Sequence, residues 1–186
     1  MTTSAHLKQF RVLAQYNAWV NEKLYERIAT LTEEERQRYL GTFFNSIHGT
    51  LNHILLADRA WLGRFATGTC NQFTALQNAK LIFQFESLSA ILYSDFEELW
   101  QERRESDRTI QQWMQELTPE VLTTRLHYTN PARGIEREHS LWFGLTHFYN
   151  HQTHHRGQIT TLLHQMNQDY GVTDLLALYH LVPDLV

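Results

Sequence analysis

The stretch "SIHGTLNHILLADRAWLGRF", residues 46–65, decides the fold, because apolar side chains surround most of its circumference when it is wound into a helix. A helix that is apolar on nearly all sides belongs inside a domain, with other elements packed around it. We therefore predict a central helix over residues 46–66 and expect the flanking segments to cover it.

Three other segments have the pattern of long helices. Core-facing residues over 7–31 recur at alternating spacings of three and four, which is typical of a helix with one face against a core. A further helix is predicted over 86–117 and ends before Pro119, because proline disfavours the α conformation in the preceding residue. The last long helix is predicted over 139–168. With 3 prolines and 8 glycines, the chain favours long helices over a many-turned β architecture.

A shorter segment interrupts the helical pattern before the last helix. Residues 121–138 alternate around the turn-forming run Asn-Pro-Ala-Arg-Gly, which predicts a small hairpin or an extended loop. The tail after residue 171 is expected to form a short capping helix or a packed strand. The predicted fold is all-α: an antiparallel four-helix bundle with a small extended or hairpin insertion, in a single domain spanning 1–186.

Composition narrows the classes of partner. The formal net charge of −4 argues against nucleic acid, because phosphate binding needs a basic surface. No apolar stretch is long enough to span a bilayer, and the N-terminus has no apolar signal region, so we expect no membrane partner. Cys70 is the single cysteine, so an internal disulfide is impossible and a reducing compartment fits. We expect a cytoplasmic protein.

Histidines are concentrated near the end of the chain, with 11 in all and several within the predicted last helix. At about 100° per residue, His151 and His155 fall in the middle of the apolar stripe of that helix. His147 lies near its edge, where it could line a pocket, and His154 lies well off it. Imidazoles on adjacent turns can each place a nitrogen about 2.0–2.1 Å from one ion. The alternative is that both are core histidines satisfied by hydrogen bonds.

The central helix offers a third histidine. His53 shares a face with Gly49, Ala57 and Ala60, small residues that would leave room around an imidazole. His48 lies about 140° away from it, so one site is not expected to use both. His53, His151 and His155 together would give three protein ligands and at least one open position, which characterises reactive metal sites, whereas structural zinc usually has four ligands.

Polar residues also occur where leucine would be expected. Asn17 and Asn21 lie at the centre of the apolar stripe of the first helix. Their side chains either form interhelical hydrogen bonds that fix register, which we favour, or line a polar cavity over the metal. Asp58 is similarly placed, and it could pair with Arg103 or Arg156 or orient a ligand histidine. Arg156 is thus a further candidate for the surroundings of the site.

Three stretches carry a resemblance to a known family. They are "YNAWVNEKL" (16–24), the central "SIHGTLNHILLADRAWLGRF" and "HFYNHQTHHRGQITTLL" (147–163). In this order, and over nearly the whole chain, the sequence resembles the DinB family. The wider group includes YfiT-like proteins and bacterial thiol-dependent S-transferases and isomerases.

The resemblance implies an antiparallel four-helix bundle, frequently a homodimer, that holds a divalent metal through three histidines. Carried over residue by residue, the ligands are His53, His151 and His155, the same set that the helix faces select. The resemblance implies nickel or zinc, with iron or manganese as further candidates, since imidazole suits several metals. Some relatives use a low-molecular-weight thiol, whereas many have no known activity.

These observations predict a metal-dependent enzyme that acts on a small molecule, as a thiol S-transferase or a hydrolase. The chain offers no obvious nucleophile of its own, because Cys70 lies alone in a predicted loop. A thiol cosubstrate at the open metal position would supply one, because coordination deprotonates it. The alternative is a non-catalytic metal-binding module with a stress-response or structural role.

Overall fold

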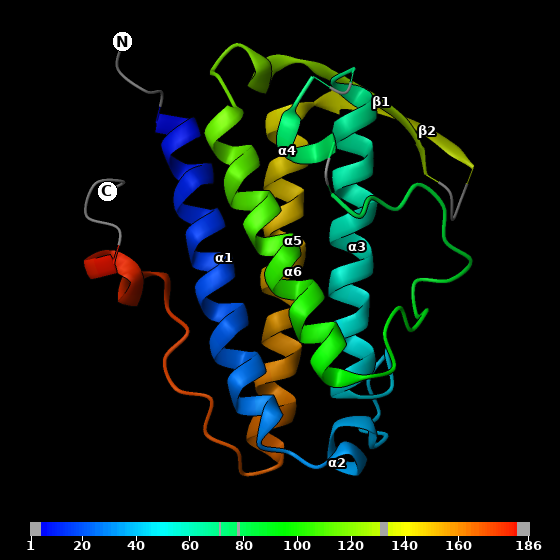
Figure 1. The fold of residues 1–186 in the computed structure, drawn as a ribbon, viewed down its shortest axis with the longest axis vertical. Helices are drawn as coiled ribbons and strands as arrows, with labels where there is room; N and C mark the ends of the chain where they lie inside the picture. Colours follow the sequence, from blue (N-terminus) through cyan, green and yellow to red (C-terminus); the bar gives the residue numbers. More distant parts are fainter. Residues whose placement is uncertain (1–4, 71, 78, 131–133, 182–186) are drawn as a thin grey trace.

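The computed structural model describes residues 5–70, 72–77, 79–130 and 134–181. Four long helices lie side by side along the long axis of the molecule (Figure 1). They are α1 (Ala5–Ala29), α3 (Ile47–Gly68), α5 (Phe96–Glu116) and α6 (Leu141–Gln165). The shorter elements are α2 (Glu33–Gln37), α4 (Thr74–Gln77), the 3-10 helices η1 (Val121–Thr123) and η2 (Leu175–Leu181), and a hairpin. The predicted helical fold with a hairpin before the last long helix is confirmed.

The helices pack as two antiparallel pairs. α1 packs mainly on α5, and α3 packs on α6. In Figure 1, α1 and α6 run downward, whereas α3 and α5 run upward. Because α3 and α5 run in the same direction, residues 69–95 must carry the chain back along the outside of the bundle before α5 begins.

The central position predicted for α3 is confirmed, since 18 of its 22 residues are buried. Ser46 caps the helix by accepting a hydrogen bond from the Gly49 amide at 3.0 Å. Gly49 has no room for a side chain, because a Cβ there would lie 2.1 Å from the Phe44 carbonyl oxygen. The segment before α3 therefore packs directly against its first turn.

The helix predicted over 86–117 was wrong at its start, because α5 begins at Phe96 with Asp95 as its N-cap. Residues 79–95 instead form an irregular crossover loop that is bonded to α3. Asn52 is fully buried, and its Oδ1 accepts hydrogen bonds from the amides of Leu92 and Tyr93, both at 2.9 Å. These tertiary bonds satisfy backbone groups that a helix would have used, and they override the local pattern.

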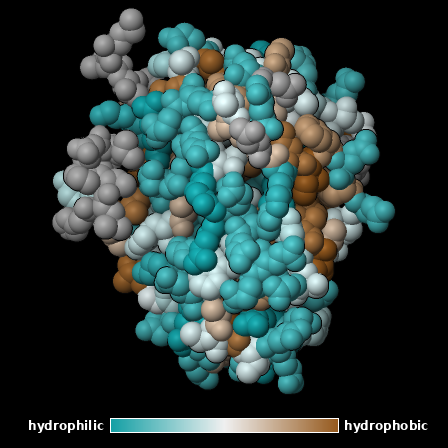
Figure 2. Space-filling view, in the orientation of Figure 1, coloured by the Kyte–Doolittle hydropathy of each residue, from teal (hydrophilic) through white to brown (hydrophobic). Residues whose placement is uncertain are grey.

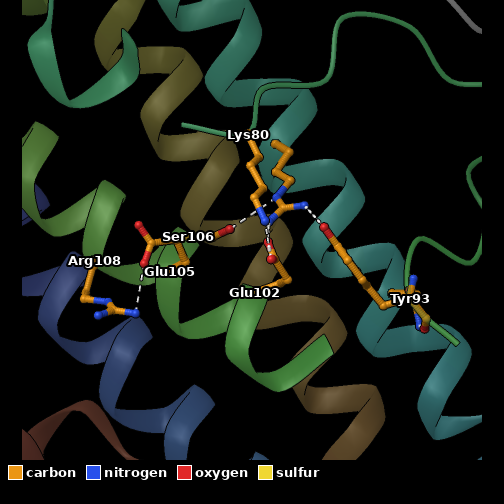
Figure 3. Close-up of polar contacts among 8 residues, drawn as sticks. Lys80, Tyr93, Glu102, Glu105, Ser106 and Arg108 are labelled. Atoms are coloured by element: carbon orange, nitrogen blue, oxygen red, sulfur yellow. Dashed lines mark hydrogen bonds and ion pairs between the residues drawn. The ribbon is translucent and has the colours of Figure 1, made fainter. Parts of the chain in front are cut away.

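Charged side chains fix the crossover loop to α5 as well. Glu102 forms an ion pair with Lys80 of the loop (Figure 3). It forms a second ion pair with Arg59 of α3. Arg59 also donates to the Tyr93 hydroxyl at 2.9 Å. In Figure 2, the face of α1 and α5 is mostly hydrophilic, while apolar side chains gather along the right edge, over α3 and the crossover loop.

The hairpin consists of β1 (Arg125–Asn130) and β2 (Ile135–Ser140), paired antiparallel with Arg125 opposite Ser140. Gly134, with φ +62°, lies in the connection, and residues 131–133 of the predicted turn lie outside the described residues. The strand runs directly into α6 at Leu141, so the predicted start at 139 was two residues early. α6 also ends at Gln165, earlier than the predicted 168, and the tail contains the 3-10 helix η2.

A polar layer crosses the bundle at mid-height, between two apolar clusters. The upper cluster includes Phe10, Phe65, Trp113 and Phe148, and the lower one includes Leu24, Leu55, Leu99 and Leu162. All four long helices contribute buried polar side chains between these clusters: Asn17, Asn21, Asp58, Arg103, Asp107, Gln152 and Arg156. Among the described residues, no helix combines the length and the apolar character needed to cross a membrane.

Candidate metal centre

Three imidazoles from two helices converge at one point. His53 of α3 and His151 and His155 of α6 each offer a ring nitrogen, and these atoms lie within 4.8 Å of one another. The Nε2 atom of His151 is 3.3 Å from that of His53 and 3.1 Å from that of His155. Three nitrogens bound tetrahedrally at about 2.0–2.1 Å would be separated by about 3.3–3.4 Å. Two of the separations are close to this value, so the cluster could hold a first-row metal ion.

Hydrogen bonds on the opposite side of two rings orient them. The Nδ1 of His53 lies 2.8 Å from the Leu88 carbonyl oxygen, which can only accept, so this nitrogen carries the proton. The Nδ1 of His155 lies 2.7 Å from the Oε1 of Gln158. With Nδ1 as the donor, Nε2 keeps its lone pair and points toward the other histidines, as metal-ligating histidines require.

The protonation state also suits metal binding. Burial lowers the pKa of His53 to about 4 and that of His151 to about 3, with the neighbouring histidines adding to the effect. Burial likewise lowers the pKa of His155. The three rings are thus neutral near pH 7, which is the form that binds a metal.

The histidines line an open cleft of about 580 Å³ between α3, α6 and the crossover loop, a size typical of small-molecule sites. Ala57 and Ala60 leave room beside His53, as the sequence predicts. His147 and His154 stand at the exposed rim, and His53 stacks on Phe44 with ring centroids 3.8 Å apart. The remaining wall is largely apolar and aromatic, formed by Phe43, Trp61, Phe85 and Leu88.

Of the other predicted site residues, only His147 lies at this cleft. The structure places Asn17 and Asn21 in the polar layer, where their Nδ2 groups donate to Oδ1 of Asp107 at 3.0 and 3.1 Å. They therefore fix helix register, the interpretation favoured from the sequence, and do not line a cavity over the histidines, because Asp107 of α5 draws them inward.

Asp58 and Arg156 also belong to the polar layer. Among the three roles considered for Asp58, the structure shows the ion pair with Arg103, at 2.6 Å. Arg156 lies next to His155 in the chain, but it does not line the cleft, and its guanidinium donates to the side chain of Asn17 on α1. Neither residue contacts a histidine of the cluster in the described structure.

Several residues of the cleft were missed from the sequence. Trp61 and Arg64 share one face of α3 with His53, since the positions 53, 57, 60, 61 and 64 recur at helical spacing. Extending the face of His53 along the helix would have found both. Phe85 and Leu88 had no such signal, because both belong to the irregular crossover loop; Phe85 lay outside every predicted element, and Leu88 lay in the helix predicted over 86–117.

The fold and this cleft define a class of helical-bundle protein whose three-histidine cluster could bind a metal ion. The chain belongs to the DinB family, whose family model matches residues 1–182. It is 31% identical over 162 residues to Protein DinB of Bacillus subtilis, covering 87% of this chain and 88% of that protein. The fold is similar to a crystal structure of a DinB-like protein from Bacillus cereus, with a TM-score of 0.59 and 19% identity over 86% of this chain and 94% of that one.

Proposed function

We propose that the protein binds one divalent transition-metal ion through His53, His151 and His155. The observation that carries the proposal is the convergence of three Nε2 atoms, at 3.3 and 3.1 Å, on an open cleft. Nickel and zinc are the first candidates, with iron and manganese next, because neutral imidazole ligands suit all of them.

We further propose that the protein is a metal-dependent enzyme acting on a small molecule, as a thiol S-transferase or a hydrolase. Three protein ligands leave at least one coordination position free toward the cleft. When bound, a divalent ion supplies Lewis-acid chemistry, because its charge favours the deprotonated form of a coordinated thiol or water. Cys70 is exposed and does not line the cleft, which supports an external nucleophile such as a low-molecular-weight thiol.

His147 is the chain's own candidate for moving a proton. Its ring centroid is 5.9 Å from that of His151, and it lines the same cleft. Partial desolvation and the nearby Arg64 guanidinium lower the pKa of His147, so the ring is neutral at pH 7 and can accept a proton. In this proposal His147 accepts the proton that a thiol or water gives up on binding.

Elemental analysis of tag-free protein tests the metal site. We expect about one transition-metal ion per chain in the native protein and none in the His151→Ala, His155→Ala double variant. If the native protein takes up no nickel, zinc, iron or manganese, the three histidines are core residues and the enzyme proposal loses its basis.

A panel of electrophiles and esters, assayed with and without small thiols, tests catalysis in the metal-loaded protein. We expect turnover that disappears on chelation and that falls in His147→Gln while the metal content is unchanged. Absence of both thiol binding and metal-dependent turnover across the panels would remove the enzyme proposal.

A non-catalytic metal-binding module is the second candidate. The observation in its favour is that the ligands come from both α3 and α6, so a bound ion would cross-link two helices of the bundle. A large loss of thermal stability on chelation, without thiol binding or turnover, would support this function. The homodimer and the cytoplasmic location expected from the sequence stay predictions.

A further inference from the structure

Arg64 lines one end of the cleft, and its guanidinium is half-buried. The opposite end is where His53 contacts the crossover loop. The Cζ atom of Arg64 lies 4.7 Å from the ring centroid of Trp61 and 5.1 Å from that of Tyr128. Within the part of the chain that the structure describes, no carboxylate forms an ion pair with it. The aromatic faces hold this cation but do not neutralise its charge.

The buried arginines of the bundle, in contrast to Arg64, each have a side-chain partner that accepts a hydrogen bond or forms an ion pair. Arg59 has Glu102, and Arg103 has both Asp58 and Asp107. Arg156 donates to the amide oxygen of Asn17. Partly removing a guanidinium from water without an anionic partner is costly, and burial accordingly lowers the pKa of Arg64. A guanidinium left without a carboxylate in a ligand-sized cleft is suited to an anion that arrives with the ligand.

A continuous row of side chains connects Arg64 to the histidine cluster. The Trp61 ring, on which Arg64 stacks, has its centroid 4.9 Å from that of His147. The His147 centroid is in turn 5.9 Å from that of His151. One small molecule extended along this row can therefore reach both the guanidinium and the metal-binding end of the cleft.

Much of the cleft wall along this row is apolar. Trp61 lies between Arg64 and His147, whereas Phe44 and Leu88 contact His53 at the histidine end, and Phe85 also lines the cleft. Such a surface favours the flat or apolar body of an organic molecule, while a few polar groups fix its orientation.

We propose that the cleft takes a small organic carboxylate, with the carboxylate on Arg64 and an aromatic or other apolar body along Trp61. The other end of this ligand reaches the three-histidine cluster, and in this part the inference rests on the proposed metal site. A single guanidinium without a counter-charge matches a monoanion, and its planar donors match a carboxylate.

Cobalt(II)-loaded protein and a matched pair of thiols test this inference. The probes are 3-(mercaptomethyl)benzoate and the uncharged 3-(mercaptomethyl)benzamide, each titrated while the thiolate-to-cobalt absorption band is followed. We expect the acid to bind about 10- to 100-fold more tightly than the amide, as a charge-assisted hydrogen bond allows. In Arg64→Gln the two probes should bind equally, whereas Arg64→Lys should keep part of the preference.

Arg104→Gln is the matched control, because Arg104 stacks on Trp100 at 4.0 Å but does not line the cleft. It should keep the full preference for the acid. Equal binding of the two probes to the native protein would overturn the inference, and so would a preference that survives in Arg64→Gln, since the carboxylate would then be bound elsewhere. Circular dichroism verifies that the variants are folded.

Failure of the metal site is measured separately. If the protein takes up no cobalt, the metal proposal fails, and the Arg64 inference is then decided by calorimetry of the metal-free protein with phenylacetate and phenylacetamide. A preference for phenylacetate that disappears in Arg64→Gln would uphold the anion site, and no preference would refute it.

Discussion

At the scale of single residues, the orientation of the candidate ligands depends on groups that lie outside the proposed metal position. The Leu88 carbonyl and the Gln158 side chain each hold the Nδ1 of one histidine, so that Nε2 of that ring is free to bind. Such partners typically change metal affinity 10- to 100-fold when they are removed.

Gln158→Leu should therefore weaken zinc binding by about 10-fold, because His155 loses the acceptor that fixes its ring. Gln165→Leu, two turns further along α6 and exposed, is the matched control and should leave the affinity unchanged. Competition with a chromophoric chelator gives both affinities. An unchanged affinity in Gln158→Leu would show that this hydrogen bond does not orient the ring.

Acid should destabilise the metal-free protein. His53 and His151 have folded-state pKa values of about 4 and about 3, below the ordinary value of 6.5. Between these values the unfolded chain binds more protons than the native one, so the free energy of unfolding falls as pH drops from 6.5 toward 4. We expect a loss on the order of 2 kcal/mol from this pair, allowing for solvent screening.

Urea denaturation at pH 7.5 and 4.5 measures this loss. The double variant His53→Gln, His151→Gln should show a smaller difference between the two pH values. An equal difference in both proteins would assign the acid sensitivity to other groups.

The sequence could predict which histidines meet, because two lie on one helical stripe and the third shares a face with small residues. It could not predict the group that binds Nδ1 of His53. The Leu88 carbonyl is a backbone group of the crossover loop, and its position depends on tertiary contacts rather than on side-chain type.

At the scale of elements, two different faces of α3 contribute to the site. One face carries His53, Trp61 and Arg64 into the cleft, and Asn52, on another face, binds the crossover loop that forms one wall of this cleft. Residues 86–95 of the loop were predicted as helix because Leu88 and Leu92 have helical spacing. Asn52 prevents this by bonding two backbone amides at the end of the loop.

Asn52→Leu should cost about 2–3 kcal/mol in the free energy of unfolding, because two amides lose their acceptor in a buried position. It should also weaken metal binding, since the Leu88 carbonyl is no longer held against His53. Ser89→Ala, in the same loop but exposed, is the control and should change neither quantity. Urea denaturation and chelator competition measure the two effects. Normal metal affinity in Asn52→Leu would mean that the loop is held by other contacts.

At the scale of the whole molecule, the polar layer ties the four long helices together at one level. Its two arginines and two aspartates balance in charge, and its asparagines join α1 to α5. The sequence showed that Asn17, Asn21 and Asp58 interrupt apolar stripes. It could not show that they meet in one layer, because Asp107 and Gln152 carry no distinguishing pattern. The single domain expected over 1–186 stays a prediction, which this layer supports.

Asp58→Leu should destabilise the protein by about 3–5 kcal/mol, because Arg103 loses its shortest ion pair inside the bundle. Glu105→Ala breaks the exposed pair with Arg108 and should cost less than about 1 kcal/mol. Urea denaturation followed by both circular dichroism and tryptophan fluorescence measures these values. If the two variants are equally stable, the buried ion pair does not stabilise the fold.

The parallel direction of α3 and α5 has an evolutionary consequence. Two neighbouring helices that run in the same direction cannot be joined by a tight turn. The segment that connects them must therefore run back along the whole length of the bundle. Here that segment forms one wall of the cleft, whereas the histidines and the polar layer belong to the helices. Loop side chains such as Phe85 can therefore be exchanged to reshape that wall, while the helices and the Leu88 carbonyl that orients His53 are maintained.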